Sequence, residues 1–471
     1  MSREHPVDDM AACPCNSGKR FGACHGHYFK YVDLLSPTPN RLNFLAQNGI
    51  LREALPQGEK RRFGYGRPLE TWQQGNTRFV RVNGKAYASK NWRTFTDFLF
   101  SFLTIALGRD WWTTERSKLL HQQHPILRQF KLFTDAQRAS TPDQRGLYSV
   151  SPSGPMMALV ALAYDLYLCA HNEQIPPQLV ERLKNPFGYE GALYEAHVIG
   201  IFARAGYRIE FEDEGDVGRS HCEFTAINKG TGKRFSVEAK AVSSRSGRAG
   251  DSAHPPRFRG KLHDALKKHA DHERMVFIEL NRAIRRDSSG SPEWGNELFA
   301  QMSAAENDLT VESQPAPCAF VYVTNRPFLI GEGNTTAHYE VGGWGFKIPE
   351  FPPERLGRVL DMHRARMKHL EAYQVFRAMQ QLQTIPPSFT RDPFVLLMQA
   401  LEVESERGPG PWHPLDAFDF LFHTYHRSSR ENLVGWLSDY HEAEHLAKLS
   451  QLELAEVYCA GMVPAIINPG R

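Results

Sequence analysis

Cysteine is scarce in this chain, and its distribution excludes a disulfide framework. Only seven of the 471 residues are cysteines, and Cys13, Cys15 and Cys24 lie together near the N-terminus. Small secreted domains held by disulfides are much richer in cysteine, whereas clustered thiols in a long chain are typical of a metal site in a reducing compartment. The sequence therefore predicts a cytoplasmic protein.

Long hydrophobic runs and a strong charge of one sign are also missing. The most apolar segments, 95–107 and 156–170, are too short to cross a bilayer, and they contain Asp97 and Asp165. No signal peptide opens the sequence, so we expect no membrane association. The formal net charge of +3 is too small to indicate a nucleic-acid-binding protein by itself, so any basic surface must be local.

The sharpest motif is the N-terminal stretch 13–26, Cys-Pro-Cys-Asn-Ser-Gly-Lys-Arg-Phe-Gly-Ala-Cys-His-Gly. Cys13, Cys15, Cys24 and His25 supply the three thiolates and one imidazole that a tetrahedral structural Zn²⁺ prefers. His27 is a competing fourth ligand. Because a site with four protein ligands has no position for substrate, its role is structural or partner-binding.

This stretch is similar, nearly residue for residue, to the SEC-C motif, which occurs at the C-terminus of the secretion-translocase ATPase and in many other proteins. The resemblance implies that the same four residues hold the zinc. In the translocase the motif is associated with chaperone and ribosome contacts. A protein partner that docks through this zinc knuckle is therefore expected by analogy only.

A β-hairpin is predicted in the middle of the chain. Two alternating apolar runs, 221–227 and 234–242, flank the Gly-rich turn 228–233. A turn centred on Gly230 and Thr231 places Glu223 directly across the ladder from Glu238, with Lys240 on the same face. Directly opposed like charges repel, and a divalent cation between them converts the repulsion into a binding site.

The order of elements around this hairpin extends the pattern. A helix that carries Glu195 is predicted from Tyr189 to Ala205, followed by a strand at 207–211. A second helix around Leu262 to Leu266 and a strand at 275–280 follow the hairpin. Over residues 186–283 this arrangement resembles the core of the PD-(D/E)XK nuclease superfamily. The chain departs from that pattern at Glu223, where the family usually has Asp.

The resemblance implies an Mg²⁺- or Mn²⁺-dependent nuclease that acts on DNA or RNA, with DNA the expected partner and defence against foreign nucleic acid a conceivable role. Glu223 and Glu238 are expected to bind the metal with help from the Ala239 carbonyl. Lys240 is expected to orient the attacking water, and Glu195 to hold a water on the metal or to orient Lys240. The alternative is a non-catalytic adaptor on a decayed nuclease fold, which binds nucleic acid, ribosome or chaperone.

A basic segment follows the hairpin. Residues 243–259 are rich in Ser, Gly, Pro and Arg, and the composition predicts a loop. Four arginines in it are candidates for binding phosphates: Arg245, Arg248, Arg257 and Arg259. The competing interpretation is ordinary solvated charge. Lys261, Lys267 and Lys268 continue the positive charge and favour phosphate binding.

Four regions are predicted: a zinc knuckle at 1–27, a mainly helical region at 28–184, a nuclease-like α/β domain with a mixed sheet at 185–350, and a helical domain at 351–471. The last contains the string His441-Glu442-Ala443-Glu444-His445. Two imidazoles at i and i+4 share a helix face, as in zinc proteases. Glu444 and the absence of a strong third ligand argue against a catalytic zinc.

Overall fold

The computed structural model describes residues 64–144, 146–211, 222–242, 258–282, 293–326, 339–380, 385–386, 389, 414–438 and 440–467. These residues form two compact units. The larger comprises the described residues between 60 and 351 together with those of 370–391. The smaller comprises residues 352–369 and the described residues after 391. The units therefore follow boundaries different from the predicted domains, because 64–184 packs with 185–351 in one body.

The larger unit begins with a three-stranded antiparallel sheet of β1 (Glu70–Gln74), β2 (Thr77–Val82) and β3 (Lys85–Ser89). Strands β2 and β3 form a hairpin around the Asn83-Gly84 turn. Both turn residues have positive φ, 44° and 82°, as the tight turn of a two-residue hairpin requires. Strand β1, which the sequence analysis did not predict, pairs with β2.

Helices follow this small sheet. Their bounds are α4 (Phe95–Leu107), α5 (Arg109–Ser117), α6 (Pro125–Ala139), α7 (Gly154–Asn172), α8 (Pro177–Lys184) and α9 (Tyr189–Arg204). The start of α4 is fixed by a capping box, in which the Thr94 side chain accepts from Asp97 N and Asp97 accepts from Thr94 N. Of the predicted mainly helical region 28–184, residues 28–63 lie outside the described residues, and the described part after β3 is mainly helical.

Helix α7 is long and apolar enough to cross a membrane, and no other helix among the described residues meets both criteria. It is longer than the predicted segment 156–170. Most of its residues are buried inside the unit, where it packs against α4, α6 and α9. Because core helices also meet the length and hydropathy criterion, this is weak evidence for a membrane span.

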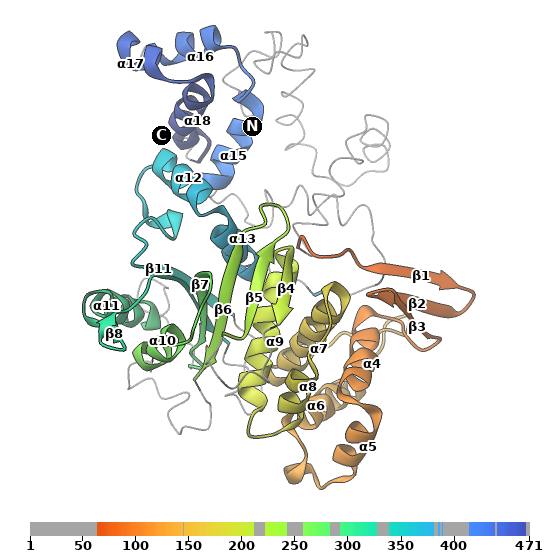
Figure 1. Cartoon of the computed structure of the whole chain (residues 1–471). Coiled ribbons are helices and arrows are strands. Elements are labelled where there is room, and N and C mark those ends of the chain that lie inside the picture. The colour runs from red at the N-terminus through yellow and green to blue at the C-terminus, as the bar shows by residue number, and fades with distance from the viewer. Residues whose placement is uncertain are drawn as a thin grey trace. The chain divides into compact units, whose positions relative to one another are not determined.

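A mixed six-stranded sheet forms the centre of the larger unit (Figure 1). The strands are β4 (Tyr207–Phe211), β5 (Phe224–Asn228), β6 (Arg234–Ala241), β7 (Glu273–Glu279), β10 (Ala319–Asn325) and β11 (Glu340–Phe346). Their order is β11-β10-β7-β6-β5-β4, with β6, β7 and β10 parallel and the other neighbours antiparallel. The predicted α/β class with a mixed sheet flanked by helices is therefore confirmed.

The connections explain the parallel strands. Helix α10 (Phe258–Leu266) lies between β6 and β7, and α11 (Glu293–Asp308) lies between β7 and β10. Parallel neighbours need such crossover connections, whereas the short 228–233 turn joins β5 and β6 as an antiparallel hairpin. The small strands β8 (Thr310–Val311) and β9 (Gln314–Pro315) pair between α11 and β10.

The two faces of the sheet carry different cores. Helix α9 covers one face, where Phe202 packs against Phe224 of β5 and Phe277 of β7. Helix α13 (Leu370–Gln380) covers the same face, with Phe376 stacked near Tyr322. Helices α10 and α11 cover the opposite face (Figure 1).

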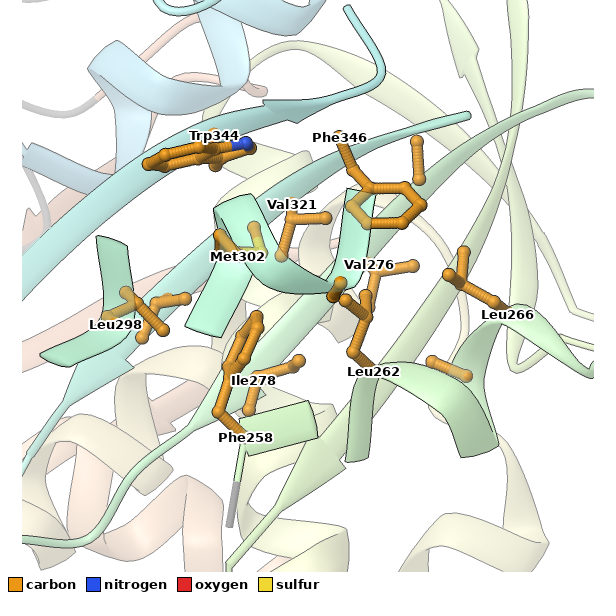
Figure 2. Packing of buried hydrophobic residues seen from close by; sticks show 14 of the residues in the cluster. Phe258, Leu262, Leu266, Val276, Ile278, Leu298, Met302, Val321, Trp344 and Phe346 are labelled. Atoms are coloured by element: carbon orange, nitrogen blue, oxygen red, sulfur yellow. The ribbon is translucent and has the colours of Figure 1, made fainter. Parts of the chain in front are cut away.

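The core under α10 and α11 is continuous and apolar. Figure 2 shows Leu262 and Leu266 of α10 near Val276 of β7, with Met302 of α11 beside Val321 of β10. Each fully buried side chain of this size contributes about 1.5–3 kcal/mol. This core fixes α10 against β6 and β7 and so determines which side chains border the polar face of β6.

The smaller unit is helical, as predicted. Its helices are α12 (Val359–Lys368), α15 (Pro414–Tyr425), α16 (Arg430–Leu437), α17 (Ala443–Lys448) and α18 (Gln451–Ile467). Helix α17 begins only after His441, so His441 and His445 do not share a helix face, and their ring centroids are 6.0 Å apart. The zinc-protease geometry is therefore absent from this string.

Candidate active site on the hairpin

The hairpin has the predicted register. Phe224 pairs with Val237 and Thr225 with Ser236, so Glu223, one residue before β5, lies opposite Glu238. Glu223 lies just outside β5, and its N–H donates to the Val237 carbonyl at 2.9 Å, which holds it at the end of the hairpin beside Glu238. The turn is held by the Asn228 side chain, whose oxygen accepts from Gly230 N at 2.9 Å and from Thr231 N at 3.0 Å. The turn chemistry therefore sets the opposition of the two glutamates.

Glu238 and Lys240 lie on the α10 side of the sheet. Val276 and Ile278 are their parallel partners on β7, and both belong to the apolar core under α10. Glu238 is 1% exposed, and its Oε1 accepts a hydrogen bond from Lys240 Nζ. Its Oε2 is buried and has no hydrogen-bond partner within the described part of the chain. A buried carboxylate oxygen without a donor is costly, and a cation would satisfy it.

The electrostatics agree with this geometry. Burial, and then the charge of Glu223, raise the pKa of Glu238 to about 7, while Lys240 and Lys268 act in the opposite direction. Burial lowers the pKa of Lys240, but the carboxylates of Glu238, Glu223 and Asp264 outweigh it, and the net shift is upward. Lys240 therefore stays protonated at neutral pH. It is suited to act as a cation rather than as a base.

Glu195 lies elsewhere. It is buried in α9, on the face of the sheet opposite Glu238, and it forms an ion pair with Arg182 of α8. The two bonds, from Arg182 Nη1 and Nη2, measure 2.7 and 2.9 Å. The structure therefore brings Glu223, Glu238 and Lys240 together and does not add Glu195 to them.

The structure describes one of the four predicted phosphate-binding arginines. Arg259 lies in α10, where its guanidinium is paired with Asp308 of α11 at 2.7 Å. Arg245, Arg248 and Arg257 lie outside the described residues, as do the zinc-knuckle residues Cys13, Cys15, Cys24 and His25. Within the described ranges, no group of three or more His, Cys, Asp or Glu is placed to hold a metal ion.

A second polar cluster lies on the α9 face at the ends of β7 and β10. The Glu279 carboxylate accepts four hydrogen bonds, from Asn281 N, Thr324 Oγ1, Arg326 N and Arg326 Nε, at 2.8–3.2 Å. Tyr194 of α9 donates to Thr324 at 3.0 Å. With its acceptor sites filled, Glu279 ties two strand ends to α9 and is structural. The sequence analysis missed this cluster, because its members come from three distant segments without a local motif.

Asp165 belongs to the same buried region. Its Oδ2 lies 3.1 Å from His197 Nδ1, and both side chains are nearly inaccessible. Burial raises the pKa of Asp165, and burial with the charges of Arg326 and Arg204 lowers the pKa of His197. A Cβ at Gly200 would lie 2.5 Å from Asp165 Oδ1, so glycine permits the close approach of α7 and α9. Asp165 is thus a buried acid paired with His197.

Comparison with known proteins identifies one short motif. The model of the SEC-C motif matches residues 11–26, the stretch that contains Cys13, Cys15, Cys24 and His25. No curated protein matches the chain. No solved structure matches it either. The SEC-C motif is therefore present at the N-terminus of this chain, and it covers only a small part of the length.

Proposed function

We propose that the protein is a metal-dependent nuclease that hydrolyses phosphodiester bonds, with DNA as the expected substrate. Glu223, Glu238 and Lys240 are its central residues. The observation that carries the proposal is the state of Glu238. One oxygen of this buried carboxylate is bound by Lys240, the other lacks a donor among the described residues, and a second carboxylate lies across the ladder.

The residues present fit Mg²⁺ or Mn²⁺. Magnesium is commonly bound by one or two protein carboxylates, with waters and substrate phosphates in the remaining positions. Two glutamates on one face therefore suffice, and a cage of three or more protein ligands is not required. A bound divalent cation would offset the charge of the phosphate and make an attacking water more acidic.

Lys240 supplies the second element of the chemistry. Its ammonium is held by Glu238 and keeps its proton, and its side chain is 21% exposed, so it retains access to the surface. A fixed cation in this position stabilises negative charge that develops on a phosphate and orients a water molecule by hydrogen bonding. Glu195 has no part in this proposal, because it is paired with Arg182 on the other face.

The order of helices and strands also supports the proposed nuclease function. Helix α9, the antiparallel strands β4, β5 and β6, helix α10 and the parallel strand β7 follow one another in the order expected for the PD-(D/E)XK core. The two glutamates and the lysine occupy the hairpin strands, where that resemblance places the catalytic residues. We propose in addition that the SEC-C stretch binds structural Zn²⁺ through its four motif residues.

Cleavage assays test the proposal. Plasmid and single-stranded DNA and RNA are incubated with Mg²⁺, Mn²⁺ or EDTA, using wild type, Lys240→Ala and the matched control Lys233→Ala. Lys233 precedes the same strand and is paired with Glu273. We expect cleavage that requires metal, falls at least about 100-fold in Lys240→Ala and persists in Lys233→Ala. Activity that survives EDTA, or that is equal in the two lysine variants, would refute the proposed site.

A non-catalytic adaptor is the second candidate, and the position of Glu195 favours it. The helix glutamate that the family resemblance assigns to the site is committed to Arg182, and Glu223 already departs from the usual Asp. An adaptor would bind nucleic acid, ribosome or chaperone without cutting, and the SEC-C stretch would dock a protein partner. Binding without cleavage in every metal condition would support this candidate.

A further inference from the structure

The segment that follows α10 lies against the Glu223 end of the hairpin. Cys222 Sγ donates to the His269 carbonyl at 3.3 Å. His272 N donates to Ser236 Oγ at 3.3 Å, and Ser236 lies on the same face of β6 as Glu238. Arg274 Nη2 donates to the Lys268 carbonyl at 3.4 Å. These bonds place the backbone of Lys268 beside the residue that precedes Glu223.

Within the described part of the chain, neither Lys268 nor Arg274 of β7 forms an ion pair, in contrast to three other cations around the sheet. Lys233, Arg234 and Arg259 each form an ion pair, with Glu273, Glu210 and Asp308 respectively. Lys268 is half-buried and forms no salt bridge within the ranges that the structure describes. The electrostatics agree with this backbone placement, since Lys268 acts to lower the pKa of Cys222, after Arg274, and the pKa of Glu238, after Lys240.

The site needs such a cation. Glu223 and Glu238 repel a polyanionic strand, and the Lys240 ammonium is already bonded to Glu238. Asp264 adds a further negative charge close enough to Lys240 to act on its pKa. A phosphate that approaches from the Glu223 end therefore meets Lys268 as a cation without a carboxylate partner in the described chain. Phosphate contacts of this kind position nucleic acid without reading its sequence.

We propose that Lys268 is a positioning residue that binds a backbone phosphate of the nucleic acid next to the reacting one, at the Glu223 end of the site. This inference rests on the proposed nuclease function and assigns a substrate-binding role to a residue after α10. Lys240 then serves the reacting phosphate, and Lys268 holds the neighbouring part of the strand. The contact is electrostatic, so it depends on salt and not on base sequence.

Three variants test the role: Lys268→Ala, the rescue variant Lys268→Arg and the matched control Lys233→Ala, which removes a lysine that is already paired with Glu273. Affinity for fluorescent single- and double-stranded oligonucleotides is measured without metal at several salt concentrations, and kcat and KM are measured with Mg²⁺. For Lys268→Ala we expect about tenfold weaker binding, a salt slope reduced by about 1, a raised KM and a kcat within about threefold of wild type. Lys268→Arg should restore affinity, and Lys233→Ala should resemble wild type.

The outcomes separate this inference from the proposed function. Equal losses in Lys233→Ala and Lys268→Ala, or a fall in kcat with unchanged KM, would overturn the role of Lys268 while wild-type cleavage upholds the nuclease. Binding that depends on Lys268 in a wild type that never cuts would keep the phosphate contact and refute the nuclease. A wild type that binds no nucleic acid refutes both.

Discussion

Lys240 donates a hydrogen bond to Glu238, two residues earlier on the same strand, and this bond occupies only one oxygen of a carboxylate that is almost fully buried. The second oxygen lies on the side chain that faces Glu223 across the ladder. Burial and Glu223 together raise the pKa of Glu238 to about 7, despite Lys240. In the metal-free protein, ionisation of Glu238 near neutral pH is therefore unfavourable, and it should lower the stability of the folded state.

The free energy of unfolding of metal-free Glu238→Gln, measured relative to wild type, should be higher at pH 8 than at pH 5. The ordinary pKa of this carboxyl is 4.5 and the folded value is about 7, so between these values the native state holds a proton that the unfolded state has lost. Wild-type stability therefore falls as pH rises through this window, and the glutamine variant lacks that loss. Chemical denaturation at pH 5, 6, 7 and 8 should show a relative gain on the order of 2 kcal/mol. Parallel curves for the two proteins would contradict the pKa assignment.

Magnesium should raise the melting temperature in a pH-dependent way. Metal binding requires ionised carboxylates, so affinity should fall by up to about tenfold per pH unit below pH 7. Wild type and Lys240→Ala should both gain stability from Mg²⁺ at pH 8, since Lys240 contributes no ligand, whereas Glu238→Gln should not. Calorimetric melts with a Mg²⁺ titration measure this. An equal gain in Glu238→Gln would place the metal elsewhere.

Zinc should be bound at one equivalent per chain. The double substitution Cys13→Ser, Cys24→Ser removes two of the four expected ligands, and elemental analysis should show the zinc lost. A matched double substitution of buried cysteines outside the motif, Cys169→Ser and Cys459→Ser, should retain it. Because the motif is short and terminal, the main melting transition should persist. A full equivalent of zinc in the motif variant would exclude the assigned ligands.

The arginines after the hairpin should contribute unequally to nucleic-acid affinity. Replacement of Arg245, Arg248 and Arg257 with Ala should reduce the slope of log affinity against log salt by about 2–3. Arg259→Ala should change the slope by less than about 1, because this guanidinium is already paired with Asp308. Fluorescence anisotropy across a salt series measures both. An unchanged slope in the triple variant would leave the segment without a binding role.

Glu195→Gln should affect folding and not metal binding. The substitution removes one partner of a two-bond ion pair whose carboxylate is buried, and a cost of about 1–3 kcal/mol is expected. The Mg²⁺-induced rise in melting temperature should equal that of wild type. A double-mutant cycle with Arg182→Gln isolates the pair energy. If Glu195→Gln instead abolished the Mg²⁺ response at unchanged stability, Glu195 would belong to the metal site after all.

Local signals in the sequence predicted much of the fold. The alternation of 234–241 and the apolar spacing of 189–204 each specify their element through short-range geometry. The opposition of Glu223 and Glu238 was also predictable, because hairpin register follows from the turn. The SEC-C stretch was recognisable because its ligands lie within fourteen residues, 13–26.

Only the tertiary structure decided which partners these residues have. Sequence order placed Glu195 near the hairpin, but the side of the sheet that α9 covers and the approach of α8 pair it with Arg182. Packing of α10 on β7 brings the Lys268 segment to Cys222, and the convergence of the ends of β7 and β10 with α9 creates the Glu279 cluster. The local sequence pattern determines which face of a strand a side chain lies on. The burial of that side chain depends on which distant elements cover the face. For Glu238, this burial raises the pKa and leaves one carboxylate oxygen without a donor among the described residues.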